Sequence, residues 1–373
     1  NEFLFDSDAG KVYDKLTQSK KMVLGSLFKY NNNKARKDTV ENDFTRPESK
    51  LVDDINLGLI GAGSHTQNQI LPAISNNKKI KIVGISTLSG INTTRLSKKY
   101  NISYSTSETN KIINDKNINC VFILSQHDTH ASYAIAALSN DKHIFVEKPL
   151  SLNKEDLDKI SDSYKKSKGK LLVGFNRRFS SHSQKAKKLV ENRKGPLFIN
   201  YRISAGHLPK DHWFHDEEKG GGRINSEPVH FLDLCNFLVG KKYTSILSQN
   251  TTFSREDQPN EDTFTTSIKY ADGSLCNISY ISSGDNLLDK EKIEIFFDDN
   301  TIVIDDFKNS TFSLKNKASS YKTWSQDKGF KTMFESFFKS LETSEELINF
   351  SEIYDATIMT LLLRNQLKGI YET

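Results

Sequence analysis

The stretch "INLGLIGAGSHTQNQILPAI", residues 55–74, decides what fold is expected of this chain. A short apolar run precedes Gly61-Ala-Gly63, and residues with helical spacing follow, which predicts a strand, a tight turn and a helix. This is the context in which a glycine fingerprint binds a dinucleotide. Gly61 allows the turn, and Gly63 lets the backbone approach a pyrophosphate held by helix amides. Thr66 takes the place of the third glycine.

Strands and helices alternate beyond this stretch. The apolar runs "KIKIVGIST", "NCVFILS" and "HIFVEKPL" are separated by the helical patterns "RLSKKY" and "THASYAIAALSN", which predicts a parallel, doubly wound sheet over residues 55–178. Longer alternating runs follow, with a hairpin turn at Asp272-Gly273 and another at Asn300. Residues 179–373 are therefore expected to form a second domain with an antiparallel or mixed sheet, closed by C-terminal helices.

Candidate cofactor residues follow the predicted strands, because open parallel sheets bind ligands at their carboxyl ends. Ser86 and Thr87 stand where an NAD enzyme often presents an acid to the ribose. Hydroxyls tolerate a 2′-phosphate better than a carboxylate does, so NAD and NADP both remain open. The candidate cofactor-binding residues are Gly61, Gly63, Ser64, His65, Ser86, Thr87, Ser125, Gln126, His130 and Glu147.

Two further residues are candidates for the chemistry. Lys148 follows an apolar strand, and Pro149 prevents a helix from starting there. The segment 220–240, "GGGRINSEPVHFLDLCNFLVG", predicts a helix that begins near Pro228, ends at Gly240 and carries His230 beside its apolar face. A solvated loop charge at Lys148 and a packing role for His230 are the alternatives.

Composition limits the possible partners. Lysine and arginine number 52 against 47 acids, a net charge of +5 without a basic arm, which argues against nucleic acid. The three cysteines are far apart and have no metal-ligand spacing, so neither disulfides nor a bound metal is expected. No apolar run reaches the roughly 18 residues of a membrane span, and no signal peptide is recognised. These observations favour a cytoplasmic protein that binds a small molecule.

Gly61-Ala-Gly63, Glu147-Lys148-Pro149 and the segment "GGGRINSEPVHFLDL" together resemble the Gfo/Idh/MocA oxidoreductases, in matching order along residues 55–370. The resemblance implies a Rossmann domain followed by an α+β domain with a large open, mostly antiparallel sheet. It also implies bound NAD(P) and hydride transfer at a secondary hydroxyl of a sugar, nucleotide sugar or cyclitol. Lys148 and His230 would then be catalytic.

One position departs from the family pattern. Four residues before the histidine the family usually has an aspartate, whereas this chain has Ser226 with Glu227 beside it. Either Glu227 takes over part of the role, or His230 acts without that partner. Candidate substrate-binding residues lie in the polar stretches leading to the glycines; they are Asn176, Arg177, Tyr201, His212, Trp213 and Glu227, with Arg178 and Asp216 nearby. Ordinary surface positions, or the core for Trp213, are the alternatives.

A narrower resemblance concerns "SQHDTHA", "VGFNRRFSSHS" and "QDKGF", which are similar to the second half of bi-domain oxidoreductases. There, a zinc-dependent alcohol dehydrogenase precedes the Gfo/Idh/MocA module, and residues 11–30 resemble its closing helix and strand. Residues 1–54 would then be an extension and linker left from such a domain, fused or acting as a partner. The resemblance favours surface-polysaccharide or sugar-nucleotide metabolism, and a homo-oligomer is expected.

Two other functions remain open from the residues. One is an NAD-dependent glycosidase of the same fold, which oxidises a sugar transiently and eliminates its substituent. The other is a non-catalytic module that keeps the sugar and cofactor pocket. Lys148 and His230 speak against the second, and Thr66 and Ser226 leave it open.

Overall fold

The computed structural model describes residues 2–4, 27–29, 48–87, 93–209, 212–216, 219–251, 263–285 and 287–370. The chain divides into two units, Asn1–Thr45 and Arg46–Thr373. In the first unit, β1 (Glu2–Leu4) pairs in parallel with β2 (Leu27–Lys29). The strand predicted at the end of residues 11–30 falls on β2. The helix predicted before it, and most of the predicted linker after it, lie outside the described residues.

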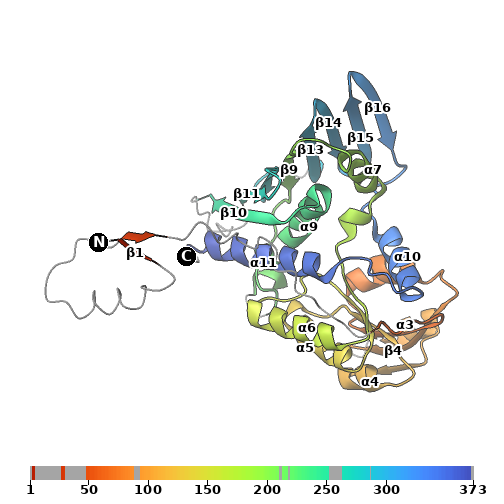
Figure 1. Ribbon diagram of the computed structural model, residues 1–373. Helices are drawn as coiled ribbons and strands as arrows, with labels where there is room; N and C mark the ends of the chain where they lie inside the picture. The colour runs from red at the N-terminus through yellow and green to blue at the C-terminus, as the bar shows by residue number, and fades with distance from the viewer. Residues whose placement is uncertain are drawn as a thin grey trace, which may run out of the picture. The chain divides into compact units, whose positions relative to one another are not determined.

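The second unit begins with a six-stranded sheet in which every pairing is parallel, in the order β5-β4-β3-β6-β7-β8 (Figure 1). The predicted doubly wound parallel sheet is confirmed. The strands are β3 (Ile55–Ile60), β4 (Ile80–Ser86), β5 (Tyr104–Thr106), β6 (Cys120–Ile123), β7 (His143–Val146) and β8 (Leu171–Val173). Strand β5 was missed because three residues with polar side chains give no apolar pattern. The strand order reverses between β3 and β6, where such sheets bind ligands.

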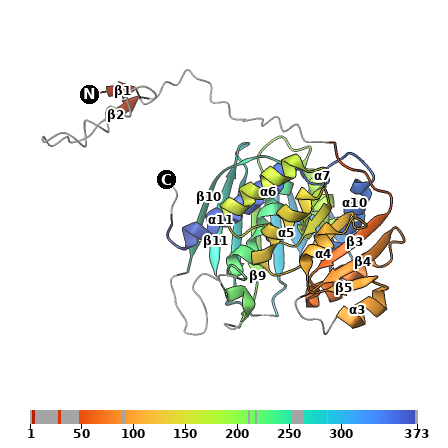
Figure 2. The same cartoon turned by 90° about the horizontal axis from the view of Figure 1, so that it is seen from below.

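Helices connect these strands. Figure 2 shows α5 and α6 beside one another over the strands. The Asn153 side chain accepts a hydrogen bond from the Asp156 amide at 2.8 Å and so caps the start of α6. The helical segments of this part are η1 (Thr66–Ile70), α2 (Leu71–Ile74), α3 (Thr93–Tyr100), α4 (Thr109–Asn114), α5 (His127–Ser139) and α6 (Lys154–Lys166).

A second sheet of eight strands runs in the order β10-β11-β12-β9-β13-β14-β15-β16. Only the β12–β9 pairing is parallel, so the mostly antiparallel open sheet is confirmed. Asp272-Gly273 makes the predicted hairpin turn, but the turn before β14 is made by Asp298 and Asp299, which have positive φ, and Asn300 begins the strand. The strands are β9 (Phe198–Ser204), β10 (Tyr243–Asn250), β11 (Phe264–Tyr270), β12 (Leu275–Ile281), β13 (Glu291–Phe297), β14 (Asn300–Asp305), β15 (Asn309–Leu314) and β16 (Lys317–Lys322).

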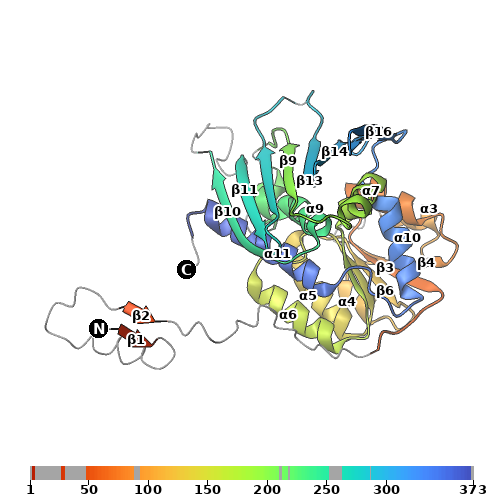
Figure 3. The ribbon, with the colours of Figure 1, turned by 45° about the horizontal axis from the view of Figure 1, so that its top comes forward.

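Helices α9 (Pro228–Val239) and α11 (Phe350–Leu367) lie between the large sheet and the Rossmann part (Figure 3). The bounds predicted for α9 are confirmed, since Pro228 is its first residue and Gly240, at φ 65°, ends it. Four shorter segments complete the junction: η2 (Asn176–Phe179), α7 (Ser181–Val190), η3 (Trp213–His215) and α8 (Arg223–Ser226).

Helix α10 (Phe330–Leu341) returns from the second sheet to the first. Its Phe334 and Phe338 rings stack on Phe122 of β6, with centroids 5.6 and 6.0 Å apart. The first half of α11 also belongs to this core, whereas Met359 and Leu363 belong to the core under the large sheet. A single domain boundary near Arg178, as predicted, therefore does not account for α10 and the first half of α11, which return to the core of the first sheet.

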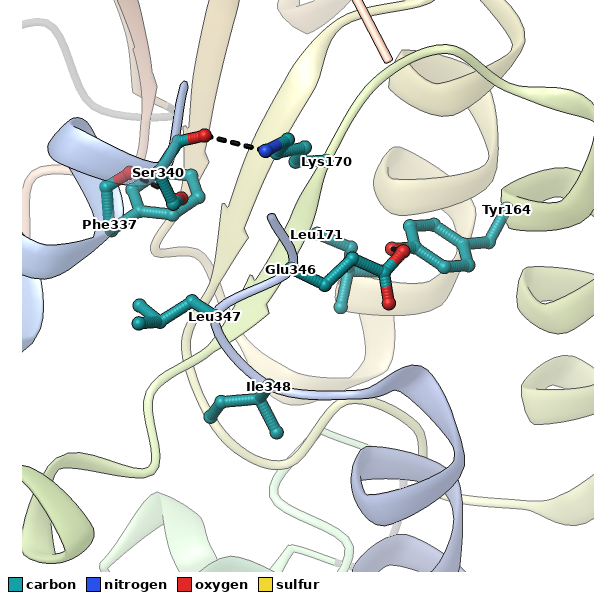
Figure 4. Close-up of a pocket in the computed structure, with 8 residues that line it drawn as sticks. All are labelled: Tyr164, Lys170, Leu171, Phe337, Ser340, Glu346, Leu347 and Ile348. Carbon is teal, nitrogen blue, oxygen red and sulfur yellow. Dashed lines mark hydrogen bonds between the residues drawn. The ribbon is translucent and has the colours of Figure 1, made fainter. Parts of the chain in front are cut away.

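Lys170, just before β8, fixes the end of α10 (Figure 4). Its ammonium donates to the carbonyl oxygens of Ser340, Thr343 and Glu345 at 2.5, 2.6 and 2.6 Å. Ser340 lies in the last turn of α10, and Thr343 and Glu345 lie just after it, so these carbonyls would otherwise need other donors. The adjoining cavity measures about 10 Å³, at the lower limit for one water molecule, so this cluster is structural.

Candidate active site

The glycine turn lies at the carboxyl end of β3. Gly61 has φ +103°, and a Cβ placed there would lie 2.5 Å from the Leu124 carbonyl oxygen, so only glycine fits. Its amide donates to the Ser86 carbonyl at 2.8 Å, which fixes the turn between β4 and β6. A Cβ at Gly63 would meet no described atom within 4 Å. The space beside Gly63 suits a dinucleotide pyrophosphate, so the residues present fit such a cofactor.

The other candidate cofactor residues gather at the same edge of the sheet. Ser86 is the last residue of β4, Ser125 and Glu147 follow β6 and β7, and exposed Ser64 and His65 adjoin the turn. The Ser86 hydroxyl is buried 3.1 Å from Thr109 Oγ1, so its side chain braces the strand end rather than facing solvent. Thr87 and the exposed Gln126 complete the set.

Glu147 is paired with the glycine turn. His65 Nε2 lies 3.3 Å from its Oε1, and the Lys148 amide donates to Oε2 at 3.2 Å. Burial opposes ionisation, but the hydrogen bond and charge of His65 and the charge of Lys148 outweigh it and lower the pKa of Glu147. The residue after Val173 is Gly174, whose Cβ would lie 3.1 Å from Oε2, so little space separates the carboxylate from this backbone.

His130 has a different role from the one predicted. The ring is fully buried, with Nδ1 2.8 Å from the Pro149 carbonyl oxygen and Nε2 3.0 Å from the Ser125 carbonyl oxygen. Both nitrogens therefore face the backbone of the two loops that carry Ser125 and Lys148. The prediction that His130 binds the cofactor directly is not supported, because its polar atoms are already used to position these loops.

Lys148 follows β7 and precedes a cis peptide bond to Pro149. Its ammonium donates to the Ser226 carbonyl at 2.9 Å and lies 5.6 Å from the centre of the Phe214 ring. Burial lowers the pKa of Lys148, against the opposing charges of Glu147 and Glu227. Lys148 is thus partly buried and contacts the second domain. The alternative, a solvated charge in a loop, does not describe it.

His230 lies in the first turn of α9, partly buried. Its Nδ1 is buried and has no hydrogen-bond partner among the described residues. Burial, and then the charges of Arg177, Lys148, Lys290 and Lys328, hold the pKa of His230 well below its usual range. The imidazole is therefore neutral near pH 7 and can accept a proton, and Lys148 is close enough to influence it.

Among the described residues, neither Ser226 nor Glu227 takes the place of the family's aspartate as a partner for His230. The Ser226 hydroxyl is buried and donates to the Gly222 carbonyl at 3.1 Å, with His127 Nδ1 3.3 Å away. Glu227 forms ion pairs with Arg223 at 3.4 Å and Lys290 at 3.3 Å. Of the two alternatives left open, the geometry favours a His230 that acts without a carboxylate partner.

Two predicted substrate residues prove to be structural. Arg177 makes a bidentate ion pair with Glu291 at 2.7 and 2.8 Å, and the Tyr201 hydroxyl donates to the same carboxylate. All three side chains are buried. The arginine charge outweighs the effect of burial and lowers the pKa of Glu291 to about 2. These contacts with Glu291 favour a structural role for Arg177 and Tyr201 over the predicted contact with substrate.

Arg178 is likewise structural, with ion pairs to Asp233 and Glu352. Asn176 is different. Its Nδ2 donates to the Lys328 carbonyl at 2.7 Å, while its Oδ1 is buried without a partner among the described residues. It remains a candidate for contact with substrate.

Aromatic rings form the wall beside Lys148. Trp213 packs on His127 with centroids 4.7 Å apart and on Phe214 at 4.5 Å, and it stays 36% exposed, which excludes a core position. Burial and the charges of Lys148 and His130 lower the pKa of His127 to about 3. His212 caps the short η3 segment by accepting from the Phe214 amide at 3.2 Å. Trp213 and His212, which lies at the start of the same segment, therefore remain candidates for contact with substrate.

Sequence reasoning missed four residues of this region, namely His127, Phe214, Lys290 and Glu291. Only Glu291 carried a signal. It stands in register with Ile293, Ile295 and Phe297 on the inward face of β13, where an acid needs a buried cation. Among the described residues, no cluster of side chains could hold a metal ion, and no helix is long and apolar enough to cross a membrane.

Fold and site together define a class of protein. The parallel sheet that carries the glycine turn supplies a lysine at a strand end, and the lysine ammonium bonds to the Ser226 carbonyl of the second domain, four residues before the neutral His230. This is the arrangement of an oxidoreductase that uses a nicotinamide cofactor.

Family models agree with this class. The oxidoreductase family model with an NAD-binding Rossmann fold matches residues 55–175, and the GFO/IDH/MocA C-terminal domain matches residues 183–303. The chain belongs to the Gfo/Idh/MocA family of oxidoreductases, and residues 55–175 are its NAD-binding domain. The predicted family, enzyme class and nicotinamide cofactor are thereby confirmed.

Individual relatives are named as dehydrogenases of inositols and of levoglucosan. Myo-inositol 2-dehydrogenase of Thermotoga maritima is 27% identical over 229 residues, 60% of this chain and 67% of that protein. The scyllo-inositol 2-dehydrogenase (NAD(+)) of Bacillus subtilis is 30% identical over 139 residues, 36% of this chain and 40% of that protein.

Solved structures share the fold. A levoglucosan dehydrogenase in complex with NADH and levoglucosan aligns with a TM-score of 0.75 at 20% identity, over 85% of this chain and 98% of that chain. The curated relatives are matched over about two thirds of their length or less.

Proposed function

We propose that this protein is an NAD(P)-dependent dehydrogenase or reductase that acts on a secondary hydroxyl of a sugar, nucleotide sugar or cyclitol. The observation that carries the proposal is the hydrogen bond from Lys148 to the Ser226 carbonyl, which joins the two domains four residues before His230, whose Nδ1 has no partner among the described residues. The names of the inositol and levoglucosan dehydrogenases that resemble it support the substrate class.

The chemistry requires a base and an electrostatic partner. The nicotinamide ring, when bound, accepts or supplies the hydride. Neutral His230 takes the proton of the substrate hydroxyl as the carbon–hydrogen bond breaks, and returns it in the reverse direction. The Lys148 ammonium, held by the Ser226 carbonyl, stabilises the alkoxide character that develops on the oxygen. Trp213 and Phe214 shield this oxygen from water on one side.

The cofactor arrangement is tested by binding. Titration with NAD, NADH, NADP and NADPH, followed by nicotinamide fluorescence or calorimetry, should show micromolar to millimolar binding of at least one pair. Gly63→Val fills the open space beside the turn, so it should weaken this binding without lowering the melting temperature. Ser75→Val, at the end of α2, is the matched control and should leave binding unchanged.

The substrate class is tested by turnover. Purified protein with the preferred cofactor is screened against cyclitols, aldoses and nucleotide sugars, and reduction or oxidation of the nicotinamide is recorded. Net cofactor turnover with a free secondary alcohol is expected. Hydrolytic release of a substituent without net cofactor turnover would contradict the proposal and favour the glycosidase alternative.

We also propose that residues 1–54 derive from a preceding zinc alcohol dehydrogenase domain, and that the enzyme acts in surface-polysaccharide or sugar-nucleotide metabolism as a homo-oligomer. The resemblance of residues 11–30 to the closing helix and strand of such a domain supports the first part. Measuring the mass of the native polypeptide with an antibody raised against residues 55–373 tests it. Light scattering of the same protein tests the oligomer.

A further inference from the structure

Glu291 is surrounded by more positive charge than it can neutralise. The carboxylate is fully engaged by the bidentate Arg177 and by the Tyr201 hydroxyl, yet Lys328 Nζ also lies 3.1 Å from Oε1. One carboxylate balances one cation. The charge of Lys328, whose side chain is 21% exposed, is therefore in excess at this point.

Glu227 repeats the pattern on the other side of His230. Arg223 is buried and lies 3.4 Å from one carboxylate oxygen, and it also donates to the Gly206 carbonyl at 2.9 Å. Lys290 lies 3.3 Å from the other carboxylate oxygen, with 37% of its side chain exposed. Here too one acid holds an arginine and a lysine, and the more exposed cation is the lysine.

The excess charge is directed at the candidate site. Lys290 is paired with Glu227, three residues before His230, and the backbone carbonyl of Lys328 accepts a hydrogen bond from the Asn176 side chain. The positive charges of both lysines help to lower the pKa of His230. Lys148 adds a further ammonium whose hydrogen bond is to a neutral carbonyl. Buried or half-buried cations without equal negative charge are costly, and binding of an anion would remove that cost.

We propose that the substrate carries an anionic oxygen group, a carboxylate or a phosphate, that is bound between Lys290 and Lys328 while its secondary hydroxyl lies at His230. This rests on the proposed function and narrows its substrate class to charged sugars. Two sources provide the group. One is the carboxylate of a sugar acid, and the other is the diphosphate of a nucleotide sugar.

The test uses four probes on the protein saturated with NADH: D-glucose, D-glucuronate, UDP-glucose and UDP-glucuronate, each titrated by calorimetry at fixed ionic strength. We expect at least one anionic probe to bind tenfold or more tightly than D-glucose. D-glucuronate alone would identify a sugar carboxylate, and UDP-glucose alone would identify the diphosphate. Lys290→Gln and Lys328→Gln should each weaken the preferred anionic probe about tenfold.

Lys308 provides the matched control. It is the reverse case, one lysine paired with the two acids Asp306 at 2.9 Å and Asp289 at 3.4 Å, so Lys308→Gln should leave all four affinities unchanged. Glu227→Gln removes a negative charge beside Lys290 and should therefore increase the affinity for anionic probes relative to that for D-glucose. Melting temperatures identify any variant that fails to fold.

Three results would overturn the proposal: equal binding of charged and neutral probes, absence of binding by both classes of anion up to millimolar concentration, or equal weakening of charged and neutral probes by the lysine variants. The last would mean that the lysines only support the two carboxylates. These outcomes differ from failure of the proposed function, which would appear as absent NADH binding or absent hydride transfer.

Discussion

Two sets of polar side chains lie at the junction of the sheets. Each set includes a cation, but we assign them different roles. Arg177, Glu291 and Tyr201 form a buried cluster in which the carboxylate accepts two hydrogen bonds from the guanidinium and one from the hydroxyl. Lys148 and His230 lie nearby, but the lysine donates only to a backbone carbonyl and the histidine Nδ1 has no partner among the described residues. We infer from this comparison that satisfied hydrogen bonds, rather than residue type or burial, separate the structural polar groups from those proposed for catalysis.

The largest expected effect is on the stability of the satisfied cluster. Arg177→Met leaves Glu291 buried without its bidentate partner, so the free energy of unfolding should fall by about 3–5 kcal/mol. Urea denaturation followed by circular dichroism measures this. Arg202→Met is the control, because the guanidinium of Arg202 contacts only the Asp289 carbonyl, at 3.3 Å, and its loss should cost less than about 1 kcal/mol. Equal losses in the two variants would contradict the comparison.

The next effect is on turnover at the unsatisfied pair. His230→Ala and Lys148→Ala should each lower kcat/KM about a hundredfold or more on the sugar found by the screen, while NADH affinity stays nearly unchanged. The double variant should lose much less than the product, because both side chains serve one proton and hydride transfer. Steady-state kinetics and fluorescence titration measure the two quantities. Near-normal turnover in both single variants would make Lys148 and His230 packing residues.

The dependence of folding stability on pH gives a further test of the comparison. The pKa of Glu291 is lowered to about 2 from an ordinary value of 4.5, so its carboxylate contributes stability that is present above pH 4.5 and lost as pH falls from 4.5 to 2. Glu291→Gln should remove this part of the pH dependence, which denaturation curves between pH 5 and pH 3 would reveal. Glu294→Gln, on the same strand with a partly exposed side chain, should leave the slope unchanged.

The smallest expected effect belongs to Ser226. Its hydroxyl bonds to backbone carbonyls and to His127 rather than to His230, so Ser226→Ala should cost about 1 kcal/mol of stability. Turnover should change by less than about fivefold. A loss of turnover as large as that of His230→Ala would show that this hydroxyl takes over the role of the family aspartate.

Much of this arrangement is encoded locally. The glycine turn, the alternation of strands and helices, and the bounds of α9 follow from short-range patterns of glycine, proline and apolar residues, and these predictions are confirmed. Lys148 and His230 were selected because each stands beside such a pattern. Their catalytic roles remain predictions.

The rest depends on contacts that no local pattern encodes. Arg177 and Glu291 are separated by 114 residues, and an arginine in a polar stretch reads equally well as a substrate ligand. The contacts of His130 with two loop carbonyls, and the convergence of Lys290 and Lys328 on His230, likewise arise only when distant loops meet. The helices and strands could be predicted from local patterns, whereas the pairs of charged side chains could not.

The return of α10 to the first sheet has a consequence for synthesis on the ribosome. Phe122 and Phe145 are covered by the rings of Phe334 and Phe338, roughly 190–215 residues later in the chain. At translation rates of about 5–20 residues per second, the rings of Phe122 and Phe145 remain uncovered for roughly 10–40 seconds. The nucleotide-binding half cannot complete its core when its own last strand leaves the ribosome, and during that interval its apolar face is open to chaperones and to other nascent chains.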